Sequence, residues 1–141
     1  MDAELKSKIL VAFQTLPDGC RSAPAGESAL VEFEAEFGSI PADFRWFLKT
    51  CGGGTVGSEW VDDIDELSAT HRRFRVQCTV PDGWKMRDIF VIGWDGSGNP
   101  FGIQHCSGAI LVEDHDFGGI HTLADSFSTF LEFGLLDKSE S

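Results

Sequence analysis

Four consecutive residues late in the chain are of the types that bind divalent metals: Glu113, Asp114, His115 and Asp116, with His121 shortly after. Carboxylate and imidazole groups are suitable ligands for such ions. Successive side chains on a strand point to opposite faces, however, so four neighbours cannot converge on one ion. The two histidines also lack the i, i+4 spacing of a helical zinc motif. We therefore interpret this run as a solvated acidic strand end and predict no metal site.

Two glycine-rich segments have the outline of ligand-binding loops. Residues 52–57 match G-x-G-x-x-G, but a dinucleotide site needs that loop to follow a strand and open a helix. Here the loop follows a helical pattern and leads towards a strand. Residues 95–99 begin like a calcium loop, yet Pro100 and Cys106 stand where that loop requires Gly and Glu. Both segments are better explained as turns, and we predict no cofactor.

No nucleophile stands in a catalytic sequence context. The patterns G-x-S-x-G and S-x-x-K are absent, and we predict no catalytic residue. Four cysteines are widely spaced without a C-x-x-C pair: Cys20, Cys51, Cys78 and Cys106. We interpret them as reduced thiols, and the charged N-terminus lacks the apolar core of a signal peptide, so we expect a cytoplasmic protein. A Cys–His pair formed only in three dimensions, such as Cys106 with His105 or His121, stays open.

Acidic residues dominate the charge of the chain. Twenty-three Asp and Glu against 11 Lys and Arg give a formal net charge of −12. This charge argues against nucleic acid or an anionic membrane as a partner and favours a basic protein. Residues 88–137 carry eight acids and no Lys or Arg, whereas five bases gather within residues 72–87. Two acidic clusters are therefore predicted to contact a partner: Glu59, Asp62, Asp63, Asp65 and Glu66, and then Asp95, Glu113, Asp114 and Asp116.

The elements that must position these acids follow from hydrophobic spacing and turn residues. Helices are predicted over residues 2–16, 27–37, 41–51 and 123–133. For the last of these helices, Thr122 is the predicted N-cap in a capping box with Asp125. An antiparallel meander is predicted over residues 88–94, 101–105 and 109–113. Between these groups we expect a strand at 55–60 and a helical turn or two within 61–74.

This order of elements predicts an α+β fold: N-terminal helices, a central antiparallel sheet of about four or more strands, and a C-terminal helix packed on the sheet. A length of 141 residues fits one domain over 1–141. The four tryptophans are interpreted mainly as packing residues with locally bonded N–H groups. We interpret His71 as a surface residue beside Arg72 and Arg73.

The order of motifs resembles the SUKH superfamily of SMI/KNR-type domains. Residues 40–48 read Ile-Pro-Ala-Asp-Phe-Arg-Trp-Phe-Leu and precede Cys51-Gly52-Gly53-Gly54, similar to the family's LP-x-D-Y-x-x-F-L…NGG signature. Residues 89–101 resemble its I-G-x-D-G-G-G-N hairpin, and residues 113–131 its closing strand and helix. The resemblance covers residues 27–133. Phe44 and Cys51 stand where the family often has Tyr and Asn.

The resemblance implies a non-catalytic α+β domain. Many bacterial members look like immunity proteins, which bind and neutralise a polymorphic or contact-dependent toxin, often a nuclease with a basic surface. The predicted partner is thus a cognate protein toxin with a basic surface. The alternative is a general intracellular interaction or regulatory module without a toxin partner, since fungal relatives regulate cell-wall synthesis and a fold alone does not fix a function. A small enzyme or metal protein is the third possibility.

Overall fold

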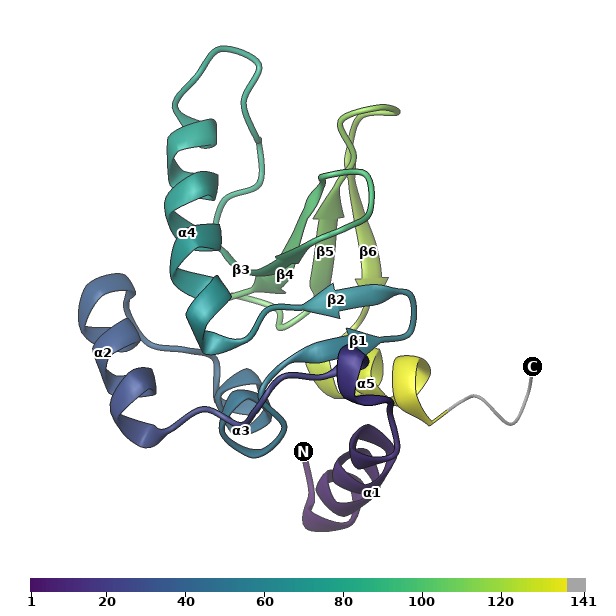
Figure 1. Cartoon of the computed structure of the whole chain (residues 1–141). Helices are drawn as coiled ribbons and strands as arrows, with labels where there is room; N and C mark the ends of the chain where they lie inside the picture. Colours follow the sequence, from purple (N-terminus) through teal and green to yellow (C-terminus); the bar gives the residue numbers. More distant parts are fainter. Residues whose placement is uncertain (137–141) are drawn as a thin grey trace.

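The computed structural model describes residues 1–136; Asp137, the last acid of the base-free stretch, lies outside them. Within these residues the chain forms five helices and two antiparallel sheets (Figure 1). The helices are α1 (Ala3–Gln14), α2 (Glu27–Phe37), α3 (Ala42–Thr50), α4 (Ile64–Cys78) and α5 (Phe127–Leu135). The strands are β1 (Gly54–Val56), β2 (Glu59–Val61), β3 (Ile89–Trp94), β4 (Pro100–Gln104), β5 (Ile110–Glu113) and β6 (Ile120–Ala124).

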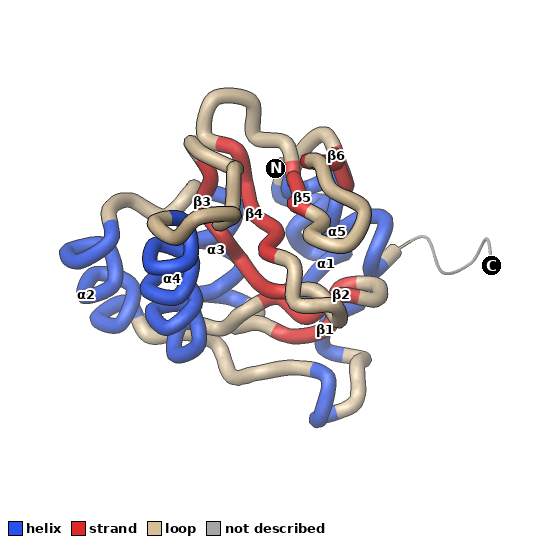
Figure 2. The backbone as a smooth tube through the Cα atoms, turned by 90° about the horizontal axis from the view of Figure 1, so that it is seen from above, coloured by secondary structure: helices blue, strands red, loops and turns tan. Residues whose placement is uncertain are grey.

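The predicted α+β fold is confirmed. Strands β3 to β6 form a four-stranded antiparallel meander in the order β3-β4-β5-β6, and β1 and β2 form a separate hairpin. Figure 2 shows α2 and α4 beside the β3 end of the sheet, with β6 at the opposite end. Helices α1 and α5 lie together at one end of the molecule, below the sheet in Figure 1. The β3 edge of the sheet therefore lies against α4, and β6 forms the opposite edge, beside α5.

Aromatic side chains fill the space between the helices and the sheet. Phe44 and Phe47 of α3 are fully buried, and both meet Phe127 of α5 edge to face, with ring centroids 5.5 and 5.6 Å apart. Phe44 also contacts Phe90 of β3 in the same way. Edge-to-face pairs at this distance add to the stabilisation from burying each ring. This core fixes α3 and α5 against the sheet.

For the region between residues 55 and 78, the sequence predicted the elements only approximately, and the structure defines them. The expected strand is the β1–β2 hairpin, and the expected helical turn or two is the 15-residue helix α4. The prediction that His71 lies on the surface is wrong. His71 is buried, with its ring against Phe33 and Phe90, because its position on α4 faces α2 and β3.

The prediction for the start of the last helix is also wrong. Thr122 does not cap a helix, because residues 120–124 form β6, the fourth strand of the meander. Helix α5 begins at Phe127, where the Ser126 hydroxyl accepts a hydrogen bond from the backbone N–H of Thr129 at 3.1 Å. A serine N-cap satisfies one of the amide groups that the first helical turn leaves free. The sheet therefore has a fourth strand, and the last helix begins later in the chain than predicted.

Candidate partner-binding surface

One acid of the first predicted cluster lies inside the protein. The Asp62 side chain is only 6% exposed and accepts a hydrogen bond from the hydroxyl of Thr70 on α4. The same hydroxyl accepts a hydrogen bond from the Trp94 indole N–H at 3.2 Å. Burial raises the pKa of Asp62 to about 7, because a carboxylate loses its hydration there. Asp62 is therefore a structural group that joins β2, α4 and β3 and is not on the accessible surface.

One acid of the second predicted cluster is buried as well. Glu113 at the end of β5 is 8% exposed. Its carboxylate accepts backbone N–H groups from Lys85 at 2.7 Å and from Met86 at 2.8 Å. Hydrogen bonds to a charged group are stronger than those between neutral groups. Glu113 thus fastens the segment after α4 onto the sheet, and a partner cannot reach its side chain.

Two further acids of the first cluster cap α4. The Asp63 carboxylate accepts the backbone N–H of Glu66 at 2.8 Å, and the Glu66 carboxylate accepts the N–H of Asp63 at 3.1 Å. This reciprocal capping box starts the helix. Glu66 also accepts the indole N–H of Trp60 at 2.9 Å. Both carboxylates keep part of their surface in solvent, so they contribute charge there while holding α4.

Asp95 and Asp114 of the second cluster organise turns. Asp95 accepts the backbone N–H groups of Ser97 and Asn99, each at 2.9 Å, within the β3–β4 turn. Asp114 accepts the N–H groups of Asp116 at 2.8 Å and of Phe117 at 3.1 Å, and these bonds lower its pKa. A side chain that closes its own turn in this way is characteristic of Asp. Both carboxylates are partly exposed.

Three of the nine predicted acids remain with little or no structural role: Glu59, Asp65 and Asp116. Glu59 is half-buried and is hydrogen-bonded by the neighbouring Ser58 hydroxyl at 3.3 Å. Asp116 is exposed and lies 3.2 Å from the His115 ring nitrogen. Asp65 is exposed and, in the described part of the chain, makes no ion pair or side-chain hydrogen bond. These are the carboxylates most available to a partner.

Asp65 belongs to an acidic hollow that the sequence analysis missed. The hollow has a volume of about 230 Å³ and lies between α2 and α4, where Glu32 and Glu36 join Asp65 around Phe33. Glu36 is paired with Arg72 at 2.7 Å. The spacing of Glu32 and Glu36 places both on one face of the helix predicted over residues 27–37. That signal was present, but the approach of Asp65 from α4 depends on tertiary packing.

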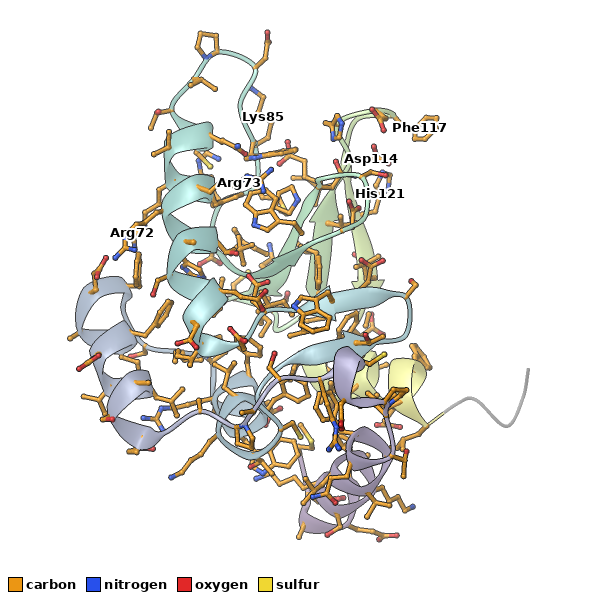
Figure 3. The ribbon with its side chains drawn as sticks, in the orientation of Figure 1. Arg72, Arg73, Lys85, Asp114, Phe117 and His121 are labelled. Atoms are coloured by element: carbon orange, nitrogen blue, oxygen red, sulfur yellow. The ribbon has the colours of Figure 1, made fainter. Side chains whose placement is uncertain are left out.

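An exposed aromatic side chain accompanies the second cluster. Phe117 is 91% exposed at the tip of the β5–β6 hairpin. Figure 3 shows it projecting away from the body of the protein, near Asp114 and His121 of the same hairpin. Aromatic residues such as Phe are enriched at protein–protein interfaces. The hairpin tip thus offers both charge and apolar surface.

Most of the basic residues between 72 and 87 are already engaged. The guanidinium of Arg73 lies 3.8 Å from the centre of the Trp94 ring, a cation–π contact, and Arg72 pairs with Glu36. Figure 3 places both on α4, with Lys85 on the segment that follows. Lys85 is exposed. Arg72 and Arg73 therefore stabilise the α4 side of the protein, whereas the backbone of Lys85 is bonded to Glu113 at the end of β5.

Within residues 1–136, no three His, Cys, Asp or Glu side chains are arranged to hold a metal ion. Over the same residues, no helix combines the length and the apolar character needed to cross a bilayer.

The comparison with protein families gives a specific result. The model of the SMI1 / KNR4 family (SUKH-1) matches residues 24–132. The chain belongs to this family. No curated protein sequence matches the chain. The resemblance inferred from the order of motifs is thus confirmed, over nearly the range predicted.

The signature residues of this SUKH-1 chain build the fold. Phe44, Phe47 and Leu48 of α3 are fully buried core residues. At Gly52 the φ angle is +97°, and a Cβ atom would lie 2.3 Å from the carbonyl oxygen of Ala23. Only glycine accommodates both conditions. The α3 and glycine motifs of the family signature therefore build the scaffold. Of the available acids, Glu59 and Asp65 lie outside the family motifs, whereas Asp95 and Asp116 lie within them.

Proposed function

We propose that this SUKH-1 protein is a cytoplasmic immunity protein that binds a cognate toxin with a basic surface and neutralises it stoichiometrically, without catalysis. Membership of the SUKH-1 family over residues 24–132 is the observation that carries the proposal. The net charge of −12 supports it, because an acidic surface steers a basic protein to contact and speeds association.

The proposed contact surface is narrower than the two acidic clusters. Asp62 and Glu113 are excluded because both are buried. Glu59, Asp65 and Asp116 are the principal charged contacts, because their carboxylates have little or no structural role to lose. The partly exposed turn and cap acids add to the field around them: Asp63, Glu66, Asp95 and Asp114.

Co-expression tests the proposal directly. Bacterial cells that produce the protein encoded beside this chain's gene should stop growing, and wild-type SUKH-1 protein should restore growth. The matched control is an unrelated nuclease toxin, which this protein should not neutralise. Failure to rescue growth at equal expression would contradict the immunity function and would favour the interaction or regulatory module instead.

A further inference from the structure

Strand β6 is an open edge of the main sheet. It is hydrogen-bonded to β5 alone, and the described residues place no other strand beside it. Residues Ile120 to Leu123 are all exposed. An edge strand presents a row of unpaired backbone N–H and C=O groups, which is a template for another strand.

The register shows which backbone groups are free. Antiparallel pairs alternate between hydrogen-bonded and non-hydrogen-bonded pairs. The N–H of Asp114 donates to the Gly119 carbonyl at 3.0 Å, and the register continues through Val112 opposite His121. His121 therefore directs its N–H and C=O towards β5. Ile120 and Thr122, which alternate with it, direct theirs outward into solvent.

The edge lacks the charged and proline residues that normally prevent strand pairing, and a β-bulge at Leu123 interrupts its pairing with β5 only near its C-terminal end. The sequence of β6 is Ile-His-Thr-Leu-Ala, which contains no Lys, Asp, Glu or Pro. Exposed edges in soluble proteins usually carry such residues, or are covered. Ile120 and Leu123 are instead 46% and 41% exposed. The outward backbone groups of β6 can therefore pair with an extended segment.

A hollow beside the strand could take a side chain of that segment. It has a volume of about 250 Å³, and its walls come from the β1–β2 turn, β6 and α5. Leu123, Phe130 and Phe133 give it an apolar lining, and Glu59 adds a carboxylate. Recognition by strand addition combines main-chain hydrogen bonds with such pockets for alternate side chains.

We infer that β6 is the docking edge for an extended segment of a basic protein, which places an apolar side chain in this hollow and Lys or Arg near the surrounding carboxylates. Those carboxylates are Glu59, Asp116 and Asp125. Residues 88–136 contain no Lys or Arg, so the surroundings of the edge favour a basic occupant. Pairing with a second copy would bring two chains of charge −12 together. The inference rests on the proposed function, in that the occupant is a segment of the toxin.

The substitution Thr122→Pro tests this docking edge. Proline removes the outward N–H at this position but leaves the bonds between His121 and β5 intact. Thr122→Val, which keeps the N–H, is the matched control. With a catalytically inactivated form of the toxin encoded beside the gene, Thr122→Pro should bind about tenfold more weakly or worse, and Thr122→Val within about twofold of wild type. Equal affinity for wild type and both variants would overturn the inference.

Amide hydrogen exchange on the wild-type protein separates the remaining outcomes. Toxin binding should slow exchange at Ile120 and Thr122, while His121 is already protected by β5 in the free protein.

If the toxin does not bind at all, the proposed function fails, and the edge is then tested with a nine-residue peptide of alternating Lys and Val. Absence of protection at millimolar peptide overturns the docking edge by itself. A dimer in sedimentation that Thr122→Pro dissociates would assign the edge to a second copy and also overturn it.

Discussion

The two edges of the main sheet differ: the β3 edge is covered by other parts of the chain, and the β6 edge is open. At the β3 edge, the His71 ring N–H donates to the Val91 carbonyl at 2.8 Å, and the backbone N–H of Asp62 donates to the Ile92 carbonyl at 2.9 Å. Helix α4 and β2 thereby close that edge. At the β6 edge, the outward groups of Ile120 and Thr122 meet no such partner within the described chain.

The difference shows that covering the β3 edge of the sheet has a cost in stability. Closing the β3 edge buries two titratable groups and shifts the pKa of each: burial lowers that of His71 to about 4 and raises that of Asp62 to about 7. Burial of such groups is unfavourable unless they are hydrogen-bonded. The β6 edge has no comparable closure and leaves apolar side chains in water. An open edge of this kind is consistent with a role in recognition.

The largest predicted effect concerns the segment that covers the sheet between the two edges. Glu113→Ala should lower the free energy of unfolding by about 4 kcal/mol, because it leaves two backbone N–H groups without their charged acceptor. Urea denaturation measures the change. Glu113→Gln keeps one acceptor oxygen and is the matched control, with a smaller loss. A Glu113→Ala protein as stable as wild type would show that this carboxylate does not fasten the segment.

A second prediction compares two neighbouring prolines on β6. His121→Pro should cost about 2 kcal/mol, because it removes an N–H directed at β5 and leaves a buried acceptor unpaired. Thr122→Pro should cost less than about 1 kcal/mol, because its N–H faces solvent. Thermal and urea unfolding of both variants give the comparison. A larger loss of stability for Thr122→Pro than for His121→Pro would mean that the N–H of Thr122, and not that of His121, is directed at β5.

The pH dependence of stability should reveal the closure of the β3 edge. In the folded protein the pKa of Asp62 is about 7, whereas in the unfolded chain it is 3.8. Between pH 5 and 6.5 the folded protein therefore holds a proton on Asp62 that the unfolded chain has lost, so the contribution of Asp62 to stability falls as pH rises. Folded His71 (pKa about 4) is neutral while the unfolded ring (6.5) is protonated, so its contribution rises with pH. The two slopes nearly cancel in the wild-type protein.

Single substitutions should separate those slopes. Asp62→Asn leaves the His71 contribution, so stability should increase by roughly 1.5 kcal/mol from pH 5 to 6.5. His71→Gln leaves the Asp62 contribution, and stability should decrease by a similar amount over that range. Unfolding free energies at four pH values are sufficient. Parallel curves for wild type and both variants would show that neither group titrates with a shifted pKa.

The smallest effect on stability is expected at the open and exposed positions. Asp65→Ser and Asp116→Ser should each change the free energy of unfolding by less than about 0.5 kcal/mol, as is usual for surface substitutions. Calorimetry would detect a larger change. A loss comparable with that of Glu113→Ala would place these acids among the structural ones and remove them from the proposed contact surface.

The amphipathic helices and the meander could be predicted from spacing and turn residues, because their patterns are local. Helix α2 was predicted with its observed bounds. Strand β6 was missed because Thr122 and Asp125 have the spacing of a capping box, whereas the pairing of residues 120–124 with β5 is a non-local interaction. Local propensity and tertiary pairing competed at this segment, and pairing decided the outcome.

The acidic surface was predictable only in outline. Residue type and charge pattern located the two clusters, but burial of Asp62 and Glu113 depends on partners distant in sequence: Thr70 for the first, Lys85 and Met86 for the second. An acid that accepts two backbone N–H groups cannot be told from a solvated acid by composition. The separation of structural from available carboxylates therefore required the folded chain.

The central claim, that the available carboxylates steer a basic toxin onto this protein, is tested most directly by association kinetics. The measurement compares wild type with the triple variant Glu59→Ser, Asp65→Ser, Asp116→Ser against the inactivated toxin encoded beside the gene, at low and at physiological salt. The account predicts an association rate about tenfold lower for the triple variant at low salt, and convergence of the two rates as salt screens the charges. Equal association rates at low salt would contradict it.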